Sequence, residues 1–390
     1  MIHVTYSLAL MLLFAVPTLA QPRGKPAPAP VVDGSIVVDC STQSDDTAVI
    51  QAAIVSADTA PYRHIRLPAH ACTFTDTLVF GGRTDRYSSI SVQGHSEYTS
   101  ILQYAGPSDR PAILISHMSA FRWSQFAVER ANYTRAGVGV QLDGPFGSGG
   151  TMNTGISFEH MEFIGFGVGL LPGGGDAASE VECRQCTFRY NAVGWTASGY
   201  NSLNFWFYGL GLSHNDVGMQ IGGPHATDGV HIIGGHSSGN TVADIQCANG
   251  FGTMDVSAFR AEIPSGGMFI KGYGCGETLA LRSNTVLSAC WCAVPVMDLH
   301  AWNMTRVEDS LIVGQITHLE SNGSIHVSNT SVMEGTPGYP VILFGPTVWH
   351  QRVSFLGNMK YGVAESGAAP RQHWFPNASG IWNGTTLEPE

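Results

Sequence analysis

Two acidic residues in the middle of the chain, Asp216 and Glu262, are spaced so that their carboxylates could act together on a glycosidic bond. They follow Leu212 and Phe259, two copies of a pattern that recurs about every two dozen residues. If each copy is one coil, carboxylates two coils apart lie ~9 to 10 Å from each other and leave room for a water molecule, as in inverting glycosidases. Asp216 lies four residues after its anchor and Glu262 three residues after its own. The pair therefore shares a face only if one turn contains a bulge.

A second grouping suits elimination rather than hydrolysis. It contains Asp244, Arg260 and Lys271, with Arg189 one residue after its own anchor as Arg260 is. A lyase must neutralise a uronate carboxylate and remove the neighbouring proton, so it needs Arg or Lys within reach, sometimes helped by calcium. Lys271 is the lysine inside the repeat region and is the candidate for that role; the alternative is a surface lysine without a catalytic task.

Aromatic residues could supply platforms for sugars, whose C–H faces pack on rings. Trp206 and Tyr208 are the best candidates, because they alternate with Phe205 and Phe207 and carry polar edges. The candidate substrate-binding set is completed by Arg189, Arg260 and His214. Other glutamates are expected on solvated coil faces: Glu159, Glu162, Glu180, Glu182, Glu308 and Glu320. The histidines of this region show no tight ligand spacing, so no metal site is expected: His214, His225, His231 and His236.

The elements that must position these residues repeat along the chain. The repeat anchors lie 25, 24 and 24 residues apart and are Phe163, Phe188, Leu212 and His236, with looser copies at Phe259, Leu287, Leu311, Val332 and Phe355. A period in the twenties predicts a solenoid, and the missing Leu spacing and high Gly content exclude leucine-rich and helical repeats. A parallel β-helix remains, with inward residues stacked in ladders. On this alignment His236 is inward-facing, so we expect a buried, hydrogen-bonded histidine.

An asparagine column accompanies the anchors. An asparagine recurs at the same place in three copies, two residues before a valine. The three are Asn191 before Val193, Asn215 before Val217 and Asn240 before Val242. Asn tolerates the left-handed backbone conformation and its amide can bond to the copy above. We interpret the column as structural.

Composition supports an all-β protein. Of the 390 residues 47 are Gly and only 13% are charged, which disfavours long helices, while a hydrophobic fraction of 44% is ample for a core. The net charge of -11 makes a nucleic-acid partner improbable, because binding phosphates needs clustered Lys and Arg.

The N-terminal region contains targeting and linking segments. The apolar run from Leu8 to Val16 and the small-residue exit before Gln21 predict a signal peptide over residues 1–20. The run is too short to span a membrane, and no later stretch qualifies. A Pro/Ala-rich linker follows over residues 21–34. One clear helix is expected at residues 47–57, with residues 49, 50, 53 and 54 on one face, as an N-terminal cap. The predicted location is extracellular or periplasmic.

Eight cysteines in an exported chain predict disulfides rather than metal ligands. Cys183 and Cys186 have the spacing of a zinc pair, but no partner pair lies at finger spacing. Glycosylation sequons begin at Asn132, Asn303, Asn322, Asn329, Asn377 and Asn383 and matter only in a eukaryotic host.

Four short motifs carry a family resemblance. The runs Val38-Asp39, Ser44 to Ile54, Ile65 to Pro68 and Ser91 to His95 resemble the N-terminal signature of the pectate-lyase superfamily, which rhamnogalacturonases, mannuronan epimerases and tailspike depolymerases share. The resemblance implies a single-stranded right-handed parallel β-helix of about 9–11 coils with an N-terminal capping helix. This domain would span residues 35–360, followed by a C-terminal cap or tail over residues 361–390.

The resemblance extends weakly to the polygalacturonase hydrolases. Gly235-His236-Ser237 and Phe269-Ile270-Lys271 are similar to two of their four motifs, but their Asn-Thr-Asp and Asp-Asp have no counterpart upstream.

Together these observations predict a secreted enzyme that cleaves an extracellular polysaccharide of plant, algal or bacterial origin. Hydrolysis without a cofactor is favoured over elimination, because a polyuronate binder usually has more basic residues than this chain with its three lysines. The alternatives are a polysaccharide lyase, with calcium as its cofactor, and a non-catalytic glycan-binding adhesin. The expected partner is the polysaccharide alone, and a monomer is favoured over a homotrimer.

Overall fold

The structure is a computed structural model that describes residues 31–388 except for the following short segments: 33, 41–44, 60–62, 82–87, 144–152, 174–177, 198–201, 223–226, 249–251, 274–277, 289–294, 300–301, 303, 319–323, 329, 334–341, 345–352, 357–359, 366–371, 377–379 and 383–386. The predicted signal peptide, most of the linker and five of the six sequons lie outside the described residues.

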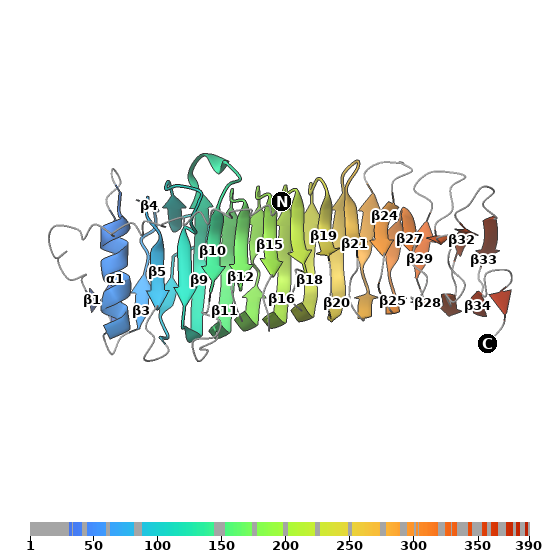
Figure 1. Cartoon of the computed structure of the whole chain (residues 1–390), viewed down its shortest axis with the longest axis horizontal. Coiled ribbons are helices and arrows are strands. Elements are labelled where there is room, and N and C mark those ends of the chain that lie inside the picture. The colour runs from blue at the N-terminus through green and yellow to red at the C-terminus, as the bar shows by residue number, and fades with distance from the viewer. Residues whose placement is uncertain are drawn as a thin grey trace, which may run out of the picture.

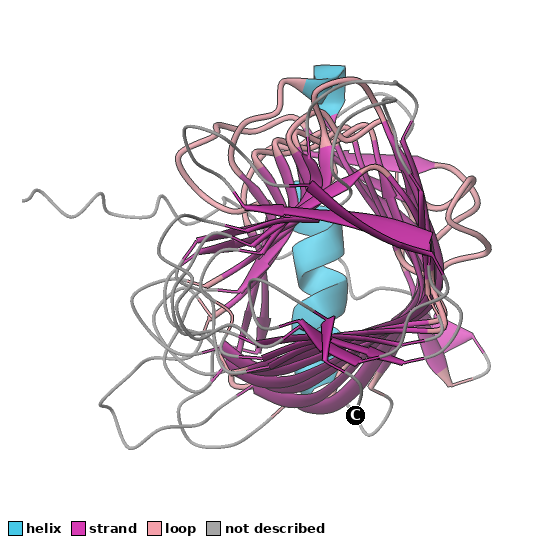
Figure 2. Cartoon of the chain, turned by 90° about the vertical axis from the view of Figure 1, so that its right-hand side faces the viewer, coloured by secondary structure: helices cyan, strands magenta, loops and turns pink. Residues whose placement is uncertain are grey.

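The chain is a parallel β-solenoid of about 9 turns with one α-helix near its N-terminus, which confirms the predicted fold class. Figure 1 shows the strands stacked side by side along the long axis, with α1 (Thr47–Thr59) at one end. Figure 2 looks along that axis and shows the strands as the walls of a tube, with the helix across its far end. Each coil contributes to three walls before it passes to the next.

Wall 1 contains the following strands or their first halves: β2 (Ser35–Val37), β3 (His64–Arg66), β6 (Ser91–Gln93), β9 (Ser119–Arg130), β11 (Asn153–Ile164), β13 (Ala178–Arg184), β16 (Ser202–Ser213), β18 (Thr227–Ser238), β20 (Thr253–Ile263), β22 (Thr278–Arg282), β25 (Met304–Glu308), β28 (Ser324–Ser328) and β31 (Val353–Leu356). The long strands bend near their middle and continue into wall 2, which also contains β4 (Ala71–Phe74), β7 (Ile101–Tyr104), β14 (Thr187–Arg189), β23 (Thr285–Ser288), β26 (Leu311–Val313) and β29 (Ser331–Met333).

Wall 3 is a separate sheet in which successive strands pair in chain order: β5 (Leu78–Gly81), β8 (Ile113–Ser116), β10 (Val138–Leu142), β12 (Val168–Pro172), β15 (Val193–Ala197), β17 (Val217–Ile221), β19 (Ala243–Ala248), β21 (Met268–Tyr273), β24 (Pro295–Leu299), β27 (Gln315–His318), β30 (Ile342–Phe344), β32 (Lys360–Glu365) and β33 (Gln372–Pro376). A single 3₁₀ turn, η1 (Ala131–Tyr133), precedes β10. β1 (Val31–Val32) pairs antiparallel with β2, and β34 (Gly380–Trp382) and β35 (Leu387–Glu388) form antiparallel pairs at the C-terminal end.

The core is a stack of apolar side chains inside the tube. Phe163 pairs with Phe188, and their rings are parallel with centroids 4.9 Å apart. Leu212 follows Phe188 in the next coil, so the first three predicted anchors are confirmed. The fourth is wrong, because the structure pairs Leu212 with Ser237, which is buried, and His236 is exposed. The offset between β16 and β18 is 25 residues along the whole pairing, one more than the 24 of the preceding coil, and a shift of one residue moves a side chain to the opposite face.

Three of the looser copies are displaced as well, Phe259 by two residues and Leu287 and Leu311 by one residue. Ser237 continues to Ala261, Val286 and Ile312, rather than to Phe259, Leu287 and Leu311. Val332 does pair with Ile312 as expected.

The asparagine column is a buried ladder of hydrogen bonds. The amide of Asn191 donates to Oδ1 of Asn215 over 3.1 Å, and that of Asn215 donates to Oδ1 of Asn240 over 3.0 Å. The predicted stacking is therefore confirmed. The predicted left-handed backbone belongs instead to the residue before each asparagine, Tyr190 and His214 among them. The asparagine side chains point inward, where their amide groups donate hydrogen bonds to buried main-chain carbonyl oxygens of the corner.

Helix α1 covers the N-terminal end of the core. Its buried residues are Ile50, Ala53, Ile54 and Ala57, whereas Val49, which we expected on this face, is 37% exposed. The face is centred one residue further along the chain than predicted, because the helix packs on β5, β2 and β3.

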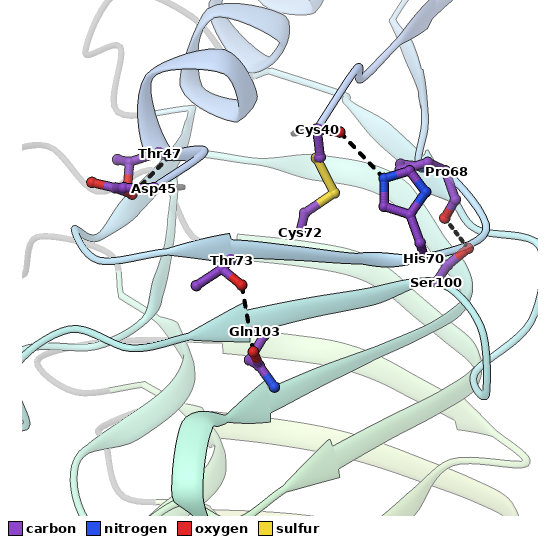
Figure 3. The surroundings of a disulfide bond; sticks show 9 residues. All are labelled: Cys40, Asp45, Thr47, Pro68, His70, Cys72, Thr73, Ser100 and Gln103. Carbon is purple, nitrogen blue, oxygen red and sulfur yellow. Dashed lines mark hydrogen bonds between the residues drawn. A yellow bond between two sulfur atoms is a disulfide. The ribbon is translucent and has the colours of Figure 1, made fainter. Parts of the chain in front are cut away.

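A disulfide and a polar turn hold this end together, as Figure 3 shows. Cys40 is joined to Cys72, which lies on the buried side of β4. Asp45 accepts hydrogen bonds from Thr47 and Thr75, and these bonds hold the pKa of its carboxyl below the usual value despite the opposing effect of burial. The start of the helix is thereby fixed to the first turn of the solenoid.

Candidate functional site

Outward-facing side chains of wall 1 form columns that run along the axis of the tube. Register places Glu182, Trp206, His231 and Asp255 in one column on four successive coils. A parallel column, two residues further along each strand, runs through Arg184, Tyr208, Ile233, Ser257 and Arg282. We call the surface formed by these two columns the wall 1 face. It brings together groups that are separated by some 25 residues per coil in the chain.

An aromatic stack lies at the middle of the wall 1 face. The rings of Trp206 and His231 are nearly parallel, at 18°, with centroids 4.0 Å apart. Tyr208 lies beside Trp206 in the same strand, with its ring inclined by only 11° and its centroid 6.3 Å away. His231 belongs to the following coil, so it covers one face of the Trp206 ring. Trp206 remains 37% exposed, as expected for a sugar platform and unlike a core residue.

A hollow of about 490 Å³ borders the other side of Trp206. Apart from Trp206 and Asn204, the lining residues come from the two preceding coils: Gly155, Ile156, Ser157, Glu180 and Glu182. Since His231 lies on the opposite side, the uncovered face of the indole is directed toward this space. We call it the Trp206 hollow. It combines a flat apolar ring with two carboxylates, the set of groups that a pyranose ring requires for stacking and for hydrogen bonds.

The two carboxylates of the Trp206 hollow are held in different ways. Glu182 forms an ion pair with Arg184, whose guanidinium lies over the Tyr208 ring, 4.5 Å from its centroid. Glu180 accepts a hydrogen bond of 3.0 Å from the hydroxyl of Thr154 and makes no ion pair among the described residues. They lie two residues apart on β13.

Hollows continue along wall 1 toward the N-terminal end. One of about 360 Å³ contains His64, Arg122, Glu159 and His160 among its lining residues, and Arg122 forms an ion pair with Glu159 there. Another, of about 280 Å³, is lined by Arg66, Leu67, Gln93, Gly94, His95 and Gln125. The polar surface therefore extends over several coils, as an extended ligand would need.

The carboxylate pair taken from the sequence, Asp216 and Glu262, does not face one common space. Asp216 lies in the corner between wall 2 and wall 3, where Arg135 binds it over 2.8 Å. Glu262 lies on wall 2 in the column of Ser213 and Ser238, and Arg260 binds it over 2.7 Å. Both pairs are exposed at the surface. Their catalytic roles stay predictions.

The second predicted grouping is also divided among walls. Lys271 lies on wall 3, in register with Gln246 and Asp298, and is half-buried. Arg260 is exposed on wall 2. Arg189 lies on wall 2 as well and binds Glu162 over 2.8 Å. His214 lies at the corner between walls 2 and 3. Of the nine predicted residues, only Trp206 and Tyr208 share the wall 1 face.

Asp244 is buried inside the tube, with an exposed fraction of 1%. Its carboxylate accepts a hydrogen bond of 2.6 Å from Ser237 and one of 2.7 Å from the amide of Asn240. Burial raises the pKa of Asp244 to about 7, and the two hydrogen bonds oppose this rise only in part. Register pairs Asp244 with Gly218, a position at which the preceding coil has no side chain. The carboxyl therefore ends the asparagine ladder.

This raised pKa predicts that stability falls as pH rises. A carboxyl whose pKa is higher in the native than in the unfolded state stabilises the fold fully below about pH 4, and this contribution is lost as pH passes about 7. Between about pH 5 and about pH 8 the loss is roughly 2–3 kcal/mol. Asp244→Asn removes the titration and keeps both contacts, because the amide can accept from Asn240 and donate to Ser237. Its free energy of unfolding should therefore depend less on pH.

The measurement is denaturant unfolding of both proteins at the two pH values. Asp216→Asn, at an exposed carboxylate, serves as the control and should keep the pH dependence of the parent. An equal pH dependence in Asp244→Asn and the parent would contradict the assignment.

Sequence reasoning missed Glu180 and Glu182 as site residues and placed both on solvated coil faces. The signal that could have identified them is their position one coil before Trp206, at the matching places of the repeat. Recognising it requires the strand register, because Glu180 has a positive φ of 56° that interrupts the simple alternation of the strand.

The cysteines follow the prediction in part. Cys40 and Cys72 form a disulfide, and Cys247 is also disulfide-bonded. Cys183 and Cys186 are instead buried free thiols, which corrects the expectation that all eight are bridged. Both side chains point into the core as small apolar groups, and burial raises the pKa of Cys183 well above its usual value. The other three cysteines lie outside the described residues.

Two features are absent from the described part of the chain. It contains no group of three or more His, Cys, Asp and Glu side chains arranged to hold a metal ion. It also contains no helix that is long and apolar enough to cross a membrane.

No protein-family model matches the sequence, and a search of curated proteins finds none similar to it. Several solved structures are similar in fold. Full-length tailspike protein 2 from Escherichia coli O157:H7 bacteriophage CAB120 is 13% identical, with 74% of this chain and 41% of that chain covered and a TM-score of 0.50. The A-module of a mannuronan C-5 epimerase from Azotobacter vinelandii is 15% identical, with coverage of 80% and 90% and a TM-score of 0.46. The catalytic domain of a GH87 α-1,3-glucanase, solved with tetrasaccharides, is 12% identical, with coverage of 87% and 66% and a TM-score of 0.45.

At these identities the likeness concerns the fold alone, and the chain spans less than half the length of the tailspike protein. The parallel β-helix implied by the resemblance to the pectate-lyase superfamily is confirmed in this sense. The division into leader, linker, helix domain and C-terminal tail stays a prediction.

Proposed function

We propose that this chain is an extracellular enzyme that binds a polysaccharide along the wall 1 face and hydrolyses its glycosidic bonds. The observation that carries the proposal is the Trp206 hollow, in which an uncovered indole face lies next to two carboxylates. A sugar ring stacked on Trp206 would place its glycosidic bond beside Glu180 and Glu182. An open hollow on an extended wall also suits a polymer better than a small metabolite, which proteins usually enclose.

The proposed reaction is inversion, in which one carboxylate activates a water molecule and the other carboxyl group protonates the leaving oxygen. Glu182, which forms an ion pair with Arg184, would accept a proton from water as the water oxygen attacks the anomeric carbon. Glu180 would donate a proton to the leaving oxygen as the carbon–oxygen bond breaks. The products are two sugar chains with inverted configuration at the new reducing end.

Elimination is the second candidate, and Arg184 is the observation that favours it. Its guanidinium lies on the wall 1 face, where it could neutralise a uronate carboxylate if Glu182 released it. Calcium would then be the expected helper.

The test is an assay on a panel of neutral glycans and polyuronates that measures new reducing ends together with absorbance near ~235 nm, which reports the unsaturated uronate of elimination. Hydrolysis predicts reducing ends without absorbance, unaffected by a calcium chelator. Trp206→Ala should raise KM by roughly tenfold, because a stacked ring contributes up to about 1.5 kcal/mol.

The control is Tyr98→Ala, which removes another exposed ring outside the wall 1 face and should leave KM unchanged. Absorbance that disappears with the chelator would establish the lyase instead. Binding without either product would show a non-catalytic glycan-binding protein, the adhesin reading of the sequence.

A further inference from the structure

A second row of exposed rings follows the corner between wall 2 and wall 3. It consists of Tyr133, Tyr190 and His214, with ring centroids 6.0 Å apart for the tyrosines and 5.2 Å apart for Tyr190 and His214. Tyr133 is 50% exposed and Tyr190 is 39% exposed. We call this row the Tyr190 corner. The whole of wall 2 separates it from the wall 1 face.

The backbone of the Tyr190 corner favours glycine rather than aromatic residues. Tyr190 and His214 have φ of 58° and 55°, in the left-handed region that side chains seldom adopt. The same position is occupied by Gly165 in the coil before and by Gly239 in the coil after, both with positive φ. Glycine therefore meets the needs of the fold at this place. The backbone therefore does not require aromatic residues here, and both rings are exposed rather than packed in the core.

The two glycines lie at the ends of the row, and the absence of their side chains leaves room for the neighbouring rings. Tyr133 has its ring over Gly165, where an added Cβ would come within 2.6 Å of the ring. At the other end the ring of His214 lies against Gly239, where a Cβ would be 3.2 Å from it. Tyr133 belongs to the coil before Gly165 and its ring fills the space that the missing side chain of Gly165 leaves open, so the row of rings continues from Tyr133 to Tyr190 and His214.

The charges of the Tyr190 corner are balanced by ion pairs. Arg135 binds Asp216 over 2.8 Å and also donates to the carbonyl oxygen of His214 over 3.0 Å. Arg189 binds Glu162 over 2.8 Å. Both guanidinium groups are already paired with carboxylates, so neither is available to neutralise an anionic polymer. A polyuronate would therefore find no available cation to offset its repulsion by these carboxylates. Rings with polar edges and paired charges suit a neutral sugar chain, which offers C–H faces for stacking and hydroxyls for hydrogen bonds.

We propose that the Tyr190 corner is a second glycan-binding surface, separate from the wall 1 face, and that its ligand is a neutral polysaccharide lying along the axis of the solenoid. It would hold the protein on the polymer while the wall 1 face acts on another segment or chain. Binding at two places raises the effective concentration of the second contact and hence the overall retention.

The test is retention in native gels that contain a soluble β-glucan, an α-glucan, a galactomannan or polygalacturonate. The protein should be retarded by at least one of the three neutral polymers. Tyr190→Gly should weaken this retention by roughly fivefold in apparent Kd, in line with the loss of one stacked ring. Its thermal midpoint should not fall, because glycine prefers the backbone conformation at this position.

The matched control is Gln185→Gly, at an exposed residue with φ of 53° on the neighbouring bend, where no ring is removed. It should keep the retention of the parent. A lower thermal midpoint for Tyr190→Gly with unchanged retention would show that the row only supports the fold and would overturn the proposal. No retention in any neutral polymer would overturn it as well.

The same gels separate this proposal from the proposed function. In the Trp206→Ala background, retention through the Tyr190 corner should persist and should fall again when Tyr190→Gly is added. Failure of the hydrolysis assay alone would therefore leave the corner intact as a binding surface.

Discussion

Glu182→Gln is expected to lower the turnover number by roughly 10²- to 10⁴-fold, which is the usual contribution of a positioned general base. Glutamine has the shape of glutamate and can still bond to Arg184, so the Trp206 hollow should keep its form and KM should change little. Only the ability to accept a proton from water is lost. The acid limb of the pH–rate profile, which reports ionisation of the base, should disappear with it.

A matched control lies on the same wall. Glu308 also forms an ion pair with an arginine, Arg282, over 3.2 Å, but it lies on β25, five coils from β13. Glu308→Gln removes the same charge from the same kind of pair and should leave turnover as in the parent. Full turnover in a folded Glu182→Gln variant would exclude Glu182 as the base and, with it, the mechanism proposed here.

The largest expected effect on stability comes from the asparagine ladder. Asn215→Ala should reduce the free energy of unfolding by roughly 3–5 kcal/mol, since each buried polar group left without a partner costs about 1–3 kcal/mol. The side chain of Asn215 accepts from the main-chain N–H and the amide of Asn191, and it donates to the carbonyl oxygen of Phe188. All three groups lie in the core, where water cannot replace the missing side chain at low cost.

Denaturant unfolding measures this loss, with Asn204→Gly as the control. Asn204 is exposed, and its φ of 60° is one that glycine adopts freely, so its replacement should change stability by only a few tenths of a kcal/mol. Equal stabilities of the two variants would mean that the ladder contributes no more than a surface asparagine.

The fold could be predicted from the sequence because its evidence is repeated. Copies of Phe188 and Leu212 at nearly constant spacing, the asparagines that follow them and the abundance of glycine all indicate stacked coils. Each coil supplies the same information, so an error in one does not alter the conclusion. Period and polarity were sufficient for the walls, the core and the ladder.

Which side chains meet in the candidate site depends on the strand register, and a single extra residue in a coil changes that register. The coil from β16 to β18 is 25 residues long instead of 24, which places His236 outward and Ser237 inward. On wall 3 the offset grows to 26, so Gly218 lies opposite Asp244, and this second shift hid the burial of that carboxyl. Period alone cannot reveal such a shift, since strands place alternate residues on opposite faces.

Glu182 was missed for a related reason. Its importance comes from Trp206 on the next coil and from Arg184 two residues away, and neither neighbour distinguishes it in the sequence from the many other glutamates. Trp206 itself could be singled out, because its alternation with Phe205 and Phe207 directs it to the surface in any register.

Both ends of the described part of the solenoid are covered by elements that do not continue the parallel coils. A coil with an unpaired edge is a template on which another molecule can add its own strands. At one end α1 lies across the opening (Figure 2), and at the other β33 reverses direction and pairs antiparallel with β32, with β34 doing the same on β31. An incoming coil would have to match a reversed strand instead of a parallel one, so the arrangement discourages the addition of further coils at this end.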